Sequence, residues 1–554
     1  MAERMSRRTF VRSSTMAAGA LYLGACGRSS PAPEPSTVRI AGGGFGFPSP
    51  FAYIAGPGYV QMSLIYDTLL WKDASGRLLP WLARRHRRSR DGRTHTFELR
   101  DGVRWHDGRA LTAHDVAFTF EYFASQPLGP LLVAQPRGVR GARATGRRTV
   151  EIELELPAST FLEAVAGAVP IIPRHIWSEI EDAPRAQERD VLIGSGAYRL
   201  LELSPGEGAA LYLANERHFL GRPFVRRVEL HPVNDELVAL QAGQIDAADT
   251  PAEGIAPDAL APFRGGDRYG MISDTGSFSF PLIFNLARGG GLADRRFRRA
   301  CALAIDRGAI VERLLGGNGR PGNPGFLPRD HPYHVPVEQY AFDPVAAERL
   351  LDEAGYRRPR PGAVRRGRDG EALSFSILTA NSPLPAVLPL LVDALKAVGV
   401  TLRPQAVDLP TLFGRLQEGA DEIVLGLYPG PGGTAPNADP DNLRTFYAST
   451  VGERLQGAQG WVDREFDRLA RRQLVTPDGP ARRRLVARMQ QVVARDVPAL
   501  ALYYPTLVNV FDRRAFDGWY FTPGGFAGGL PGVHNKHALI TGARTGLSVR
   551  PRAT

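Results

Sequence analysis

The pattern of apolar and polar positions is most informative between residues 373 and 427. Apolar runs of strand length alternate there with segments that carry apolar residues at helical spacing. The pattern predicts strands at 373–379, 400–407 and 422–427, with helices at 384–398 and 409–417. Because a β-α-β-α-β order predicts a parallel sheet, a ligand is expected beyond the carboxyl ends of its strands. These ends are Ala380, Asn381, Ser382, Asp408, Tyr428, Pro429 and Gly430.

Other segments predict a β-rich first half and a more helical middle. Thr112-Ala113-His114-Asp115 is a capping box that starts a helix, and apolar spacing predicts another helix over 59–70. A long helix or helix pair is expected over 297–315, and Asp343-Pro344 starts one that stops at Gly355. Strands are predicted at 37–40, 94–99, 149–156, 196–203, 209–213 and 227–232. The chain of 554 residues is therefore expected to be α/β, with two or three domains.

The N-terminus carries the pattern of an exported lipoprotein. Ser6-Arg7-Arg8-Thr9-Phe10-Val11 holds a twin-arginine pair, Arg7 and Arg8, and the stretch from Ser13 to Ala25 has no charged residue. It ends in Leu23-Gly24-Ala25-Cys26, the small-residue pattern that precedes a lipid-modified cysteine. Residues 1–25 are predicted to be a twin-arginine signal peptide with lipidation at Cys26, and residues 26–36 a Pro/Ser linker. The alternative is a short hydrophobic helix of a cytoplasmic protein.

Charge and cysteine content narrow the class further. The net charge is +11, of which the leader supplies four arginines against one glutamate, and basic residues are spread along the chain with acidic interruptions. Nucleic acid is therefore not an expected partner. With Cys26 lipidated, Cys301 has no partner for a disulfide, and its apolar surroundings predict a buried structural thiol.

The search for catalytic motifs gives little. Gly194-Ser195-Gly196 lacks the glycine spacing of a nucleophile elbow, and the glycines at 42–46 lack a complete dinucleotide fingerprint. His331 and His334 have no third clear metal ligand nearby. The sequence therefore predicts no catalytic residue, no metal and no cofactor. An exported hydrolase stays the alternative of a different class, since a spatially assembled site leaves no local motif.

Several motifs then align in order with one family. Phe97 to Val116, with its Arg100-Asp101-Gly102-Val103-Arg104-Trp105 core, is the most specific of them. The others are Ile65–Leu70, Leu79–Ala83, Gly194–Tyr198, Leu240–Asp246, Phe284-Asn285, Arg298–Arg307 and Asp343–Tyr356. Over residues 37–522 the chain resembles the extracellular solute-binding proteins of family 5, the oligopeptide, dipeptide and nickel-type receptors of ABC importers.

The resemblance implies a two-lobed fold like that of periplasmic binding proteins (type II, cluster C-like), with an additional domain beside lobe 1. It places lobe 1 in residues 37–74, 191–277 and 500–545, the additional domain in 75–190, and lobe 2 in 278–499. It further implies hinge closure on a solute and docking on the permease of an ABC transporter. The expected protein is a monomer, in the periplasm or on the outer face of the cytoplasmic membrane, held there by its lipid anchor.

Solute contacts are expected from the cleft segments of such a receptor. The predicted contacts are Phe45, Gly46, Phe47, Asn381, Tyr428, Asp439, Asp441 and Arg444. Peptide receptors of the family place an Asp near residue 430 to pair with a peptide amine, and no Asp follows at that short spacing here. Asp439 or Asp441 could replace it, or could cap the next helix. A peptide or peptide-like solute is therefore the first expectation, and an oligosaccharide or a metal chelate is the alternative.

Overall fold

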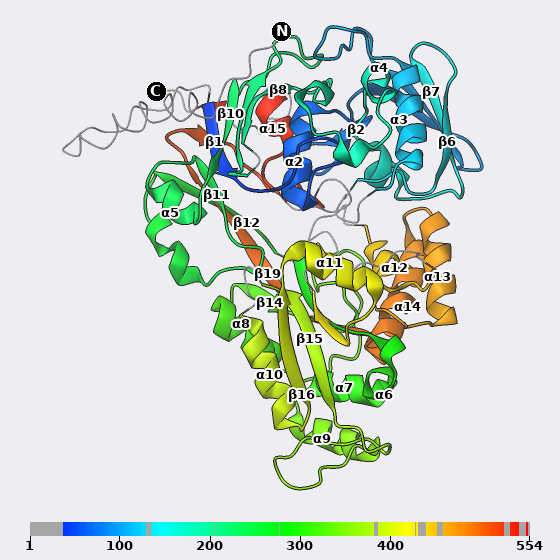
Figure 1. The fold of residues 1–554 in the computed structure, drawn as a ribbon, viewed down its shortest axis with the longest axis vertical. Helices are drawn as coiled ribbons and strands as arrows, with labels where there is room; N and C mark the ends of the chain where they lie inside the picture. The colour runs from blue at the N-terminus through cyan, green and yellow to red at the C-terminus, as the bar shows by residue number, and fades with distance from the viewer. Residues whose placement is uncertain are drawn as a thin grey trace, which may run out of the picture.

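The computed structural model describes residues 37–128, 134–204, 206–275, 278–381, 386–426, 428–429, 439–450, 458–525, 532–541 and 550–551. The predicted signal peptide, Cys26 and the linker lie outside these ranges. Within them the fold is the expected mixed α/β type, with one lobe above and one below in Figure 1. No helix in these ranges combines the length and apolar composition needed to cross a bilayer.

The β-α-β-α-β unit predicted from the apolar pattern is confirmed in lobe 2. The strand β15 (Ser374–Ala380) pairs in parallel with both β16 (Thr401–Val407) and β17 (Ile423–Leu425). The helices α10 (Val387–Ala397) and α11 (Leu409–Glu418) connect them. The carboxyl ends of these strands therefore lie together, as the sequence predicted.

Lobe 1 contains a second parallel arrangement. The strand β1 (Thr37–Gly42) pairs in parallel with β10 (Arg227–Pro232) and β11 (Ala247–Asp249). The strands β8 (Tyr198–Ser204) and β9 (Ala209–Ala214) extend the sheet by antiparallel pairing. The short helix α5 (Glu236–Gln241) lies between β10 and β11. The carboxyl ends of β1, β10 and β11 form a second shared edge.

A separate four-stranded antiparallel sheet lies beside lobe 1. Its order is β4-β5-β7-β6, with bounds Ala83–Arg88, Thr94–Leu99, Thr149–Leu154 and Val139–Ala144. Phe97 and Leu99 of β5 are buried, as their alternation predicted, and α3 (Ala113–Ser125) contacts β6 and β7. The backbone of Thr112 donates to the Asp115 carboxylate at 2.8 Å, which confirms the capping box. This sheet shares one hydrophobic core with lobe 1, and the exact domain boundaries stay a prediction.

The strand β19, together with β12 and β13 beside it, connects the lobes. The strand β19 (Ala499–Asp512) pairs along its length with β13 (Phe278–Phe284) of lobe 2 and with β12 (Tyr269–Thr275) of lobe 1. Figure 1 shows β19 passing from the lower lobe into the upper one. The register of β13 against β19 shifts between Phe280 and Pro281. This ribbon joins the sheets of both lobes into one, and it is where a hinge motion would bend the chain.

The helices of lobe 2 follow local signals. The 297–315 region forms a pair, α7 (Arg295–Ala304) and α8 (Arg307–Leu315), because Asp306 caps the second helix by accepting from the Ala309 amide at 2.8 Å. Cys301 of α7 is buried, and burial raises the pKa of its thiol. The described residues of this lobe also form the helices α6 (Gly290–Ala293), α9 (Pro344–Glu353), α12 (Asn442–Tyr447), α13 (Arg464–Val475) and α14 (Pro480–Asp496).

One helix expectation is wrong at its C-terminal end. The helix predicted over 59–70 is α2 (Ala55–Ile65), and Leu70 instead begins β2 (Leu70–Lys72). The chain leaves the helix where the Asp67 carboxylate meets the Lys536 ammonium at 2.9 Å, and both side chains are fully buried. Lys536 begins α15 (Lys536–Thr541). The chain just beyond the helix is thus held by a contact from the far end of the sequence.

Candidate functional site

The carboxyl ends of the lobe 2 strands supply three of the predicted positions. Asn381 is exposed, and its backbone amide donates to Val407 at 2.8 Å. Asp408 caps α11 by accepting from the Thr411 amide at 2.8 Å, and this hydrogen bond lowers the pKa of the carboxyl. Tyr428 lies in β18 (Tyr428–Pro429) and pairs with Ser279 of β13. Asn381 and Tyr428 are thus at the expected edge, and their contact with a solute stays a prediction.

The loop after β1 holds the three predicted lobe 1 contacts. Gly46 has φ +78°, and a Cβ there would come within 2.4 Å of the Ala52 carbonyl oxygen, so the turn requires glycine. The Ile54 amide donates to the Phe45 carbonyl at 2.8 Å, which folds the loop back on itself. Phe47 is buried in the lobe 1 core, whereas Phe45 is partly exposed. Phe45 is therefore the aromatic ring of this loop that can meet a solute without the loop opening.

Asp439 and Asp441, the two carboxylates proposed to replace the missing Asp, are both engaged by arginines. The guanidinium of Arg482 donates to Asp439 from both terminal nitrogens, at 2.7 and 3.0 Å. Arg444 forms a similar pair with Asp441, at 2.6 and 2.7 Å. Asp441 occupies the N-cap position of α12, but its side chain caps no helix amide. The sequence left open a contact with a solute amine or a helix cap; side-chain capping is not found for Asp441, and the contact with a solute amine stays a prediction.

Arg482 is the centre of this network, and sequence reasoning missed it. It is 1% exposed, and besides Asp439 it donates to Asp478 at 2.7 Å, while Tyr333 donates to the same carboxylate at 2.6 Å. Burial alone would lower the pKa of Arg482, but Asp439 and Asp478 outweigh it and raise that pKa. Burial raises the pKa of Asp439, with Arg482 opposing the rise. No local pattern marks Arg482, since it lies 43 residues from Asp439.

A second set of residues lies on the side of lobe 1 that faces this network. Lys72 of β2 forms an ion pair with Glu163, which belongs to the π-helical turn η1 (Leu162–Ala166). The Ser159 amide donates to the Leu474 carbonyl oxygen of α13 at 2.9 Å, so the region beside lobe 1 contacts lobe 2 here. Lys72 is one of only three lysines in an arginine-rich chain. That rarity is the one sequence signal that could have singled it out.

The carboxyl edge of the lobe 1 strands carries a further polar cluster. Asp249, at the end of β11, donates its backbone amide to Glu236 at 2.7 Å and accepts from Asn509 of β19 at 2.9 Å. His534 lies 3.5 Å from the other Asp249 oxygen. Burial and the charge of Asp249 raise the pKa of Glu236 to about 7. Within the described ranges, no three His, Cys, Asp or Glu side chains converge as metal ligands would.

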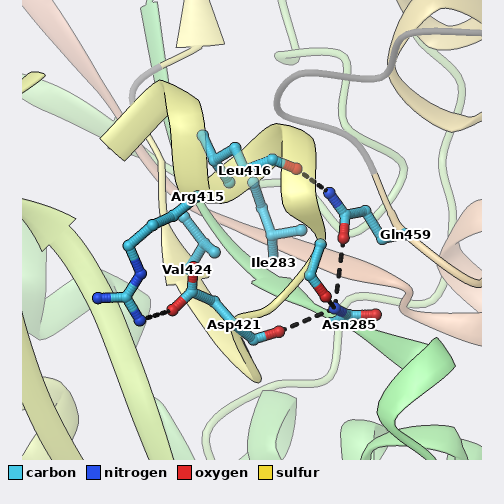
Figure 2. Close-up of a pocket in the computed structure, with 8 residues that line it drawn as sticks. Ile283, Asn285, Arg415, Leu416, Asp421, Val424 and Gln459 are labelled. Carbon is cyan, nitrogen blue, oxygen red and sulfur yellow. Dashed lines mark hydrogen bonds and ion pairs between the residues drawn. The ribbon is translucent and has the colours of Figure 1, made fainter. Parts of the chain in front are cut away.

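Figure 2 shows a small cavity enclosed by β13, α11 and β17 of lobe 2. Asn285 donates to the carbonyl oxygens of Gly419 and Asp421 at 3.0 and 2.8 Å, and Arg415 pairs with the Asp421 carboxylate. The cavity measures about 10 Å³, space for one water molecule at most. It is therefore a packing feature of lobe 2 and too small for a solute. A second cavity, of about 270 Å³, is also lined by lobe 2 residues alone, Arg299, Tyr340 and Arg495 among them.

Comparison with known proteins decides the family. The family model for bacterial extracellular solute-binding proteins, family 5, matches residues 77–453, more than half of the chain. The chain belongs to this family. Its members are binding proteins and are described as extracellular. The family signature thus covers both the four-stranded sheet and the β-α-β-α-β unit of lobe 2.

The sequence identity to individual relatives is low. Protein XP55 of Streptomyces lividans is 32% identical over 334 residues, which cover 60% of this chain and 59% of that protein. The oligopeptide-binding protein AppA of Bacillus subtilis is 24% identical over 432 residues, 75% of this chain and 76% of AppA.

Solved structures agree on the fold. NikA from Brucella suis, in complex with Fe(III)-EDTA, matches with a TM-score of 0.74 at 21% identity, covering 90% of this chain and 99% of NikA. AppA from Bacillus subtilis, in complex with a nonapeptide, matches with a TM-score of 0.74 at 20% identity, covering 90% of this chain and 97% of AppA. These likenesses show the two-lobed fold of the solute-binding family.

Proposed function

We propose that this protein is the solute-binding receptor of an ABC importer, and that it captures a peptide or peptide-like solute between its lobes for delivery to a membrane permease. The observation that carries the proposal is the geometry of the two lobes. They are joined by one ribbon, β12 and β13 against β19, and the region beside lobe 1 touches lobe 2 again through Ser159 and Leu474. A solute that contacts both lobes favours the closed arrangement, which is how a hinged receptor responds to its ligand.

The polar groups on the facing edges suit a peptide. Lobe 2 offers the Asp439–Arg482 and Asp441–Arg444 pairs, and lobe 1 offers Asp249 at the end of β11. A carboxylate has about four acceptor sites, so a pair with arginine leaves room for a further donor from a solute amine or amide. The relative AppA was solved with a nonapeptide, a ligand of this chemical class.

A second candidate is a solute without a free amine, such as a metal chelate or an oligosaccharide. This candidate is favoured because Asp439 and Asp441, the predicted partners of a solute amine, each already have an arginine as cationic partner. The relative NikA was solved with Fe(III)-EDTA, a metal chelate. An exported hydrolase is the alternative outside the receptor class.

Native mass spectrometry of freshly purified protein separates these candidates. A ladder of co-purifying peptides supports the peptide proposal, whereas a single oligosaccharide or metal chelate replaces it with the second candidate. Steady conversion of the bound compound by the purified protein contradicts the receptor function itself. With a peptide bound, Asp439→Asn and Asp441→Asn are expected to weaken binding at least tenfold if either pairs with the amine. The matched control is Asp182→Asn, an exposed carboxylate that pairs with Arg185.

We also infer that the receptor is tethered by lipid at Cys26 after export through the Arg7-Arg8 motif. A tether keeps a receptor close to its permease, and two acyl signals are enough for stable anchoring. In cells labelled with a clickable palmitate analogue, the wild-type chain should carry label in the membrane fraction. Cys26→Ser should lose the label, and Arg7→Lys with Arg8→Lys should leave the uncleaved chain inside the cell. Label retained by Cys26→Ser contradicts the anchor.

A further inference from the structure

The carboxyl end of β11 lies at a switch in the topology of the lobe 1 sheet. The strands β1 and β11 are neighbours there, in the order β19-β11-β1-β10. After β1 the chain next enters this sheet at β8, on the β10 side, whereas after β11 it continues to β12, which pairs with β19 on the other side. Ligands of such sheets bind beyond the carboxyl ends of neighbouring strands whose connections leave in opposite directions. Asp249, the last residue of β11, lies at this position.

Asp249 belongs to a hydrogen-bonded cluster built by separate segments of the chain. Its backbone amide donates to Glu236 of α5 at 2.7 Å, and its carboxylate accepts from Asn509 of β19 at 2.9 Å. His534, just before α15, lies 3.5 Å from the other carboxylate oxygen, and its ring packs edge-on against Trp519. Helix α5 contacts β11 and β19, and Figure 1 shows it beside β11 in the upper lobe. The fold thus fixes the positions of both carboxylates.

The cluster has more hydrogen-bond acceptors than donors. Asn509 is 0% exposed, and its amide oxygen has no hydrogen-bond donor among the described residues. Its amide nitrogen donates to the Asp249 carboxylate and to the Ala248 carbonyl oxygen, so turning the amide over would only place the oxygen against two acceptors. The unpaired oxygen therefore stays beside the Asp249 carboxylate. Because a buried polar atom without a partner costs free energy, this part of the structure lacks a donor.

The cluster also carries more negative than positive charge. No arginine or lysine of the described ranges forms an ion pair with Asp249 or Glu236, whereas Asp439 and Asp441 each hold an arginine. The ion pair of the cluster within those ranges is that of Asp249 with His534. Burial and the charge of Asp249 raise the pKa of Glu236 to about 7, as expected for a carboxyl group without a strong cationic partner. A cation that also donates hydrogen bonds would correct both deficits.

We propose that Asp249 and Glu236 form a subsite of lobe 1 that binds a protonated primary amine of the solute. An ammonium group has three hydrogen-bond donors and no acceptor, which is what the cluster lacks. The Asp249 side chain is 38% exposed, so a solute can reach it without a change in the fold. A peptide N-terminus and a lysine side chain both present this group. The subsite rests on the proposed receptor function, and it assigns the amine contact to lobe 1 rather than to Asp439 or Asp441.

The test compares three pools of pentapeptides that are offered to protein freed of co-purified solute. The first pool has free N-termini and contains no lysine or arginine, the second is the same pool acetylated, and the third is acetylated and contains one lysine per peptide. Native mass spectrometry measures what the protein retains. The wild type should retain the first or the third pool at least tenfold better than the second. The first identifies the N-terminus as the amine, and the third identifies a lysine side chain.

Variants then assign the preference to the cluster. Asp249→Asn keeps the shape of the side chain and should lower retention of the amine-bearing pool at least tenfold. Asp267→Asn and Glu207→Gln, at exposed positions on turns and bends of lobe 1, are the matched controls and should behave as the wild type. If circular dichroism shows that Asp249→Asn does not fold, Glu236→Gln replaces it, because its amide oxygen still accepts from the Asp249 amide. This variant should also retain less of the amine-bearing pool.

Two results overturn the subsite while peptides still bind, so that the proposed receptor function stands. One is equal retention of all three pools by the wild type. The other is a full preference for the amine in Asp249→Asn, or in Glu236→Gln where that variant replaces it. Retention of none of the pools by the wild type instead contradicts the peptide function, and the subsite with it.

Discussion

Two carboxylates of this protein, Asp67 in lobe 1 and Asp439 in lobe 2, each face a buried cation, and they differ in every other respect. Asp67 is fully buried and accepts hydrogen bonds from Lys536, Trp81 and Ser195 at 2.9, 2.7 and 3.0 Å. Burial alone would raise the pKa of Asp67, but Lys536 and His218 outweigh it and hold that pKa well below the usual range. These hydrogen bonds come from lobe 1 and from the region beside it, and none comes from lobe 2, so Asp67 serves the fold.

Asp439 is the opposite case. Its side chain is 26% exposed, it lies on the side of lobe 2 that faces Glu163, and its pKa is raised. A carboxylate held by four partners keeps its charge, whereas a partly exposed carboxylate with a raised pKa is more sensitive to the groups that approach it. The comparison leads us to expect a functional role for the ion pair that faces the other lobe and a structural role for the one that does not. The predictions below test that distinction.

The largest effect is expected from breaking the Asp67 pair. Asp67→Asn leaves the Lys536 ammonium buried against Trp71, 4.2 Å from its ring centre, with no carboxylate to balance it. The expected loss is about 3–5 kcal/mol in the free energy of unfolding, measured by urea denaturation. Asp182→Asn, at an exposed pair, should change it by less than about 0.5 kcal/mol. An Asp67→Asn protein as stable as the wild type would contradict the structural role given to this pair.

The parts of the fold that could be predicted from sequence are those fixed by local chemistry. The β-α-β-α-β unit was predicted within a few residues because its apolar runs and the Asp408 cap all lie within one segment. The helix over 59–70 was overextended because the chain beyond Ile65 is held by distant contacts, such as that of Asp67 with Lys536, 469 residues away. Propensity alone cannot register such a contact, since tertiary packing overrides it.

The candidate site was predictable only in outline. The strand ends located Asn381 and Tyr428, but alternation could not tell that Phe47 would turn into the core while Phe45 stayed partly exposed. Asp439 was predicted as a site residue, whereas its partner Arg482 was not. From sequence, an arginine on a helix is expected to be exposed to solvent. The spacing of Arg482 gives no indication that it pairs with Asp439.

The next effect is expected from the lobe 2 pair. Arg482→Met keeps an apolar stem at this position but removes the guanidinium from Asp439 and Asp478. Because both carboxylates are partly exposed and can be rehydrated, the expected loss of unfolding free energy is about 2–3 kcal/mol, less than for Asp67. Differential scanning calorimetry measures it. Arg488→Met on the same helix, at an exposed pair with Glu465, is the control and should cost under about 1 kcal/mol. A loss above that of Asp67→Asn would reverse the comparison.

The smallest effect extends the comparison to Glu236, a carboxylate bonded to the Asp249 amide and near His534. Burial and Asp249 raise the pKa of Glu236 to about 7. A raised carboxyl pKa means that the folded protein binds a proton more tightly than the unfolded chain, so this contribution to stability is complete below the unfolded pKa of about 4.5 and is lost as the pH rises through 7. With its partial exposure taken into account, the loss should be about 1–2 kcal/mol between pH 5 and 8. Asp67 behaves in the opposite sense. Its lowered pKa stabilises the folded protein above pH 4, and this contribution is lost only in strong acid.

Glu236→Gln should remove the loss of stability between pH 5 and 8, as measured by urea denaturation at both pH values, and Glu207→Gln should leave that loss unchanged. A Glu236→Gln protein with the wild-type difference between pH 5 and 8 would assign that difference to another group.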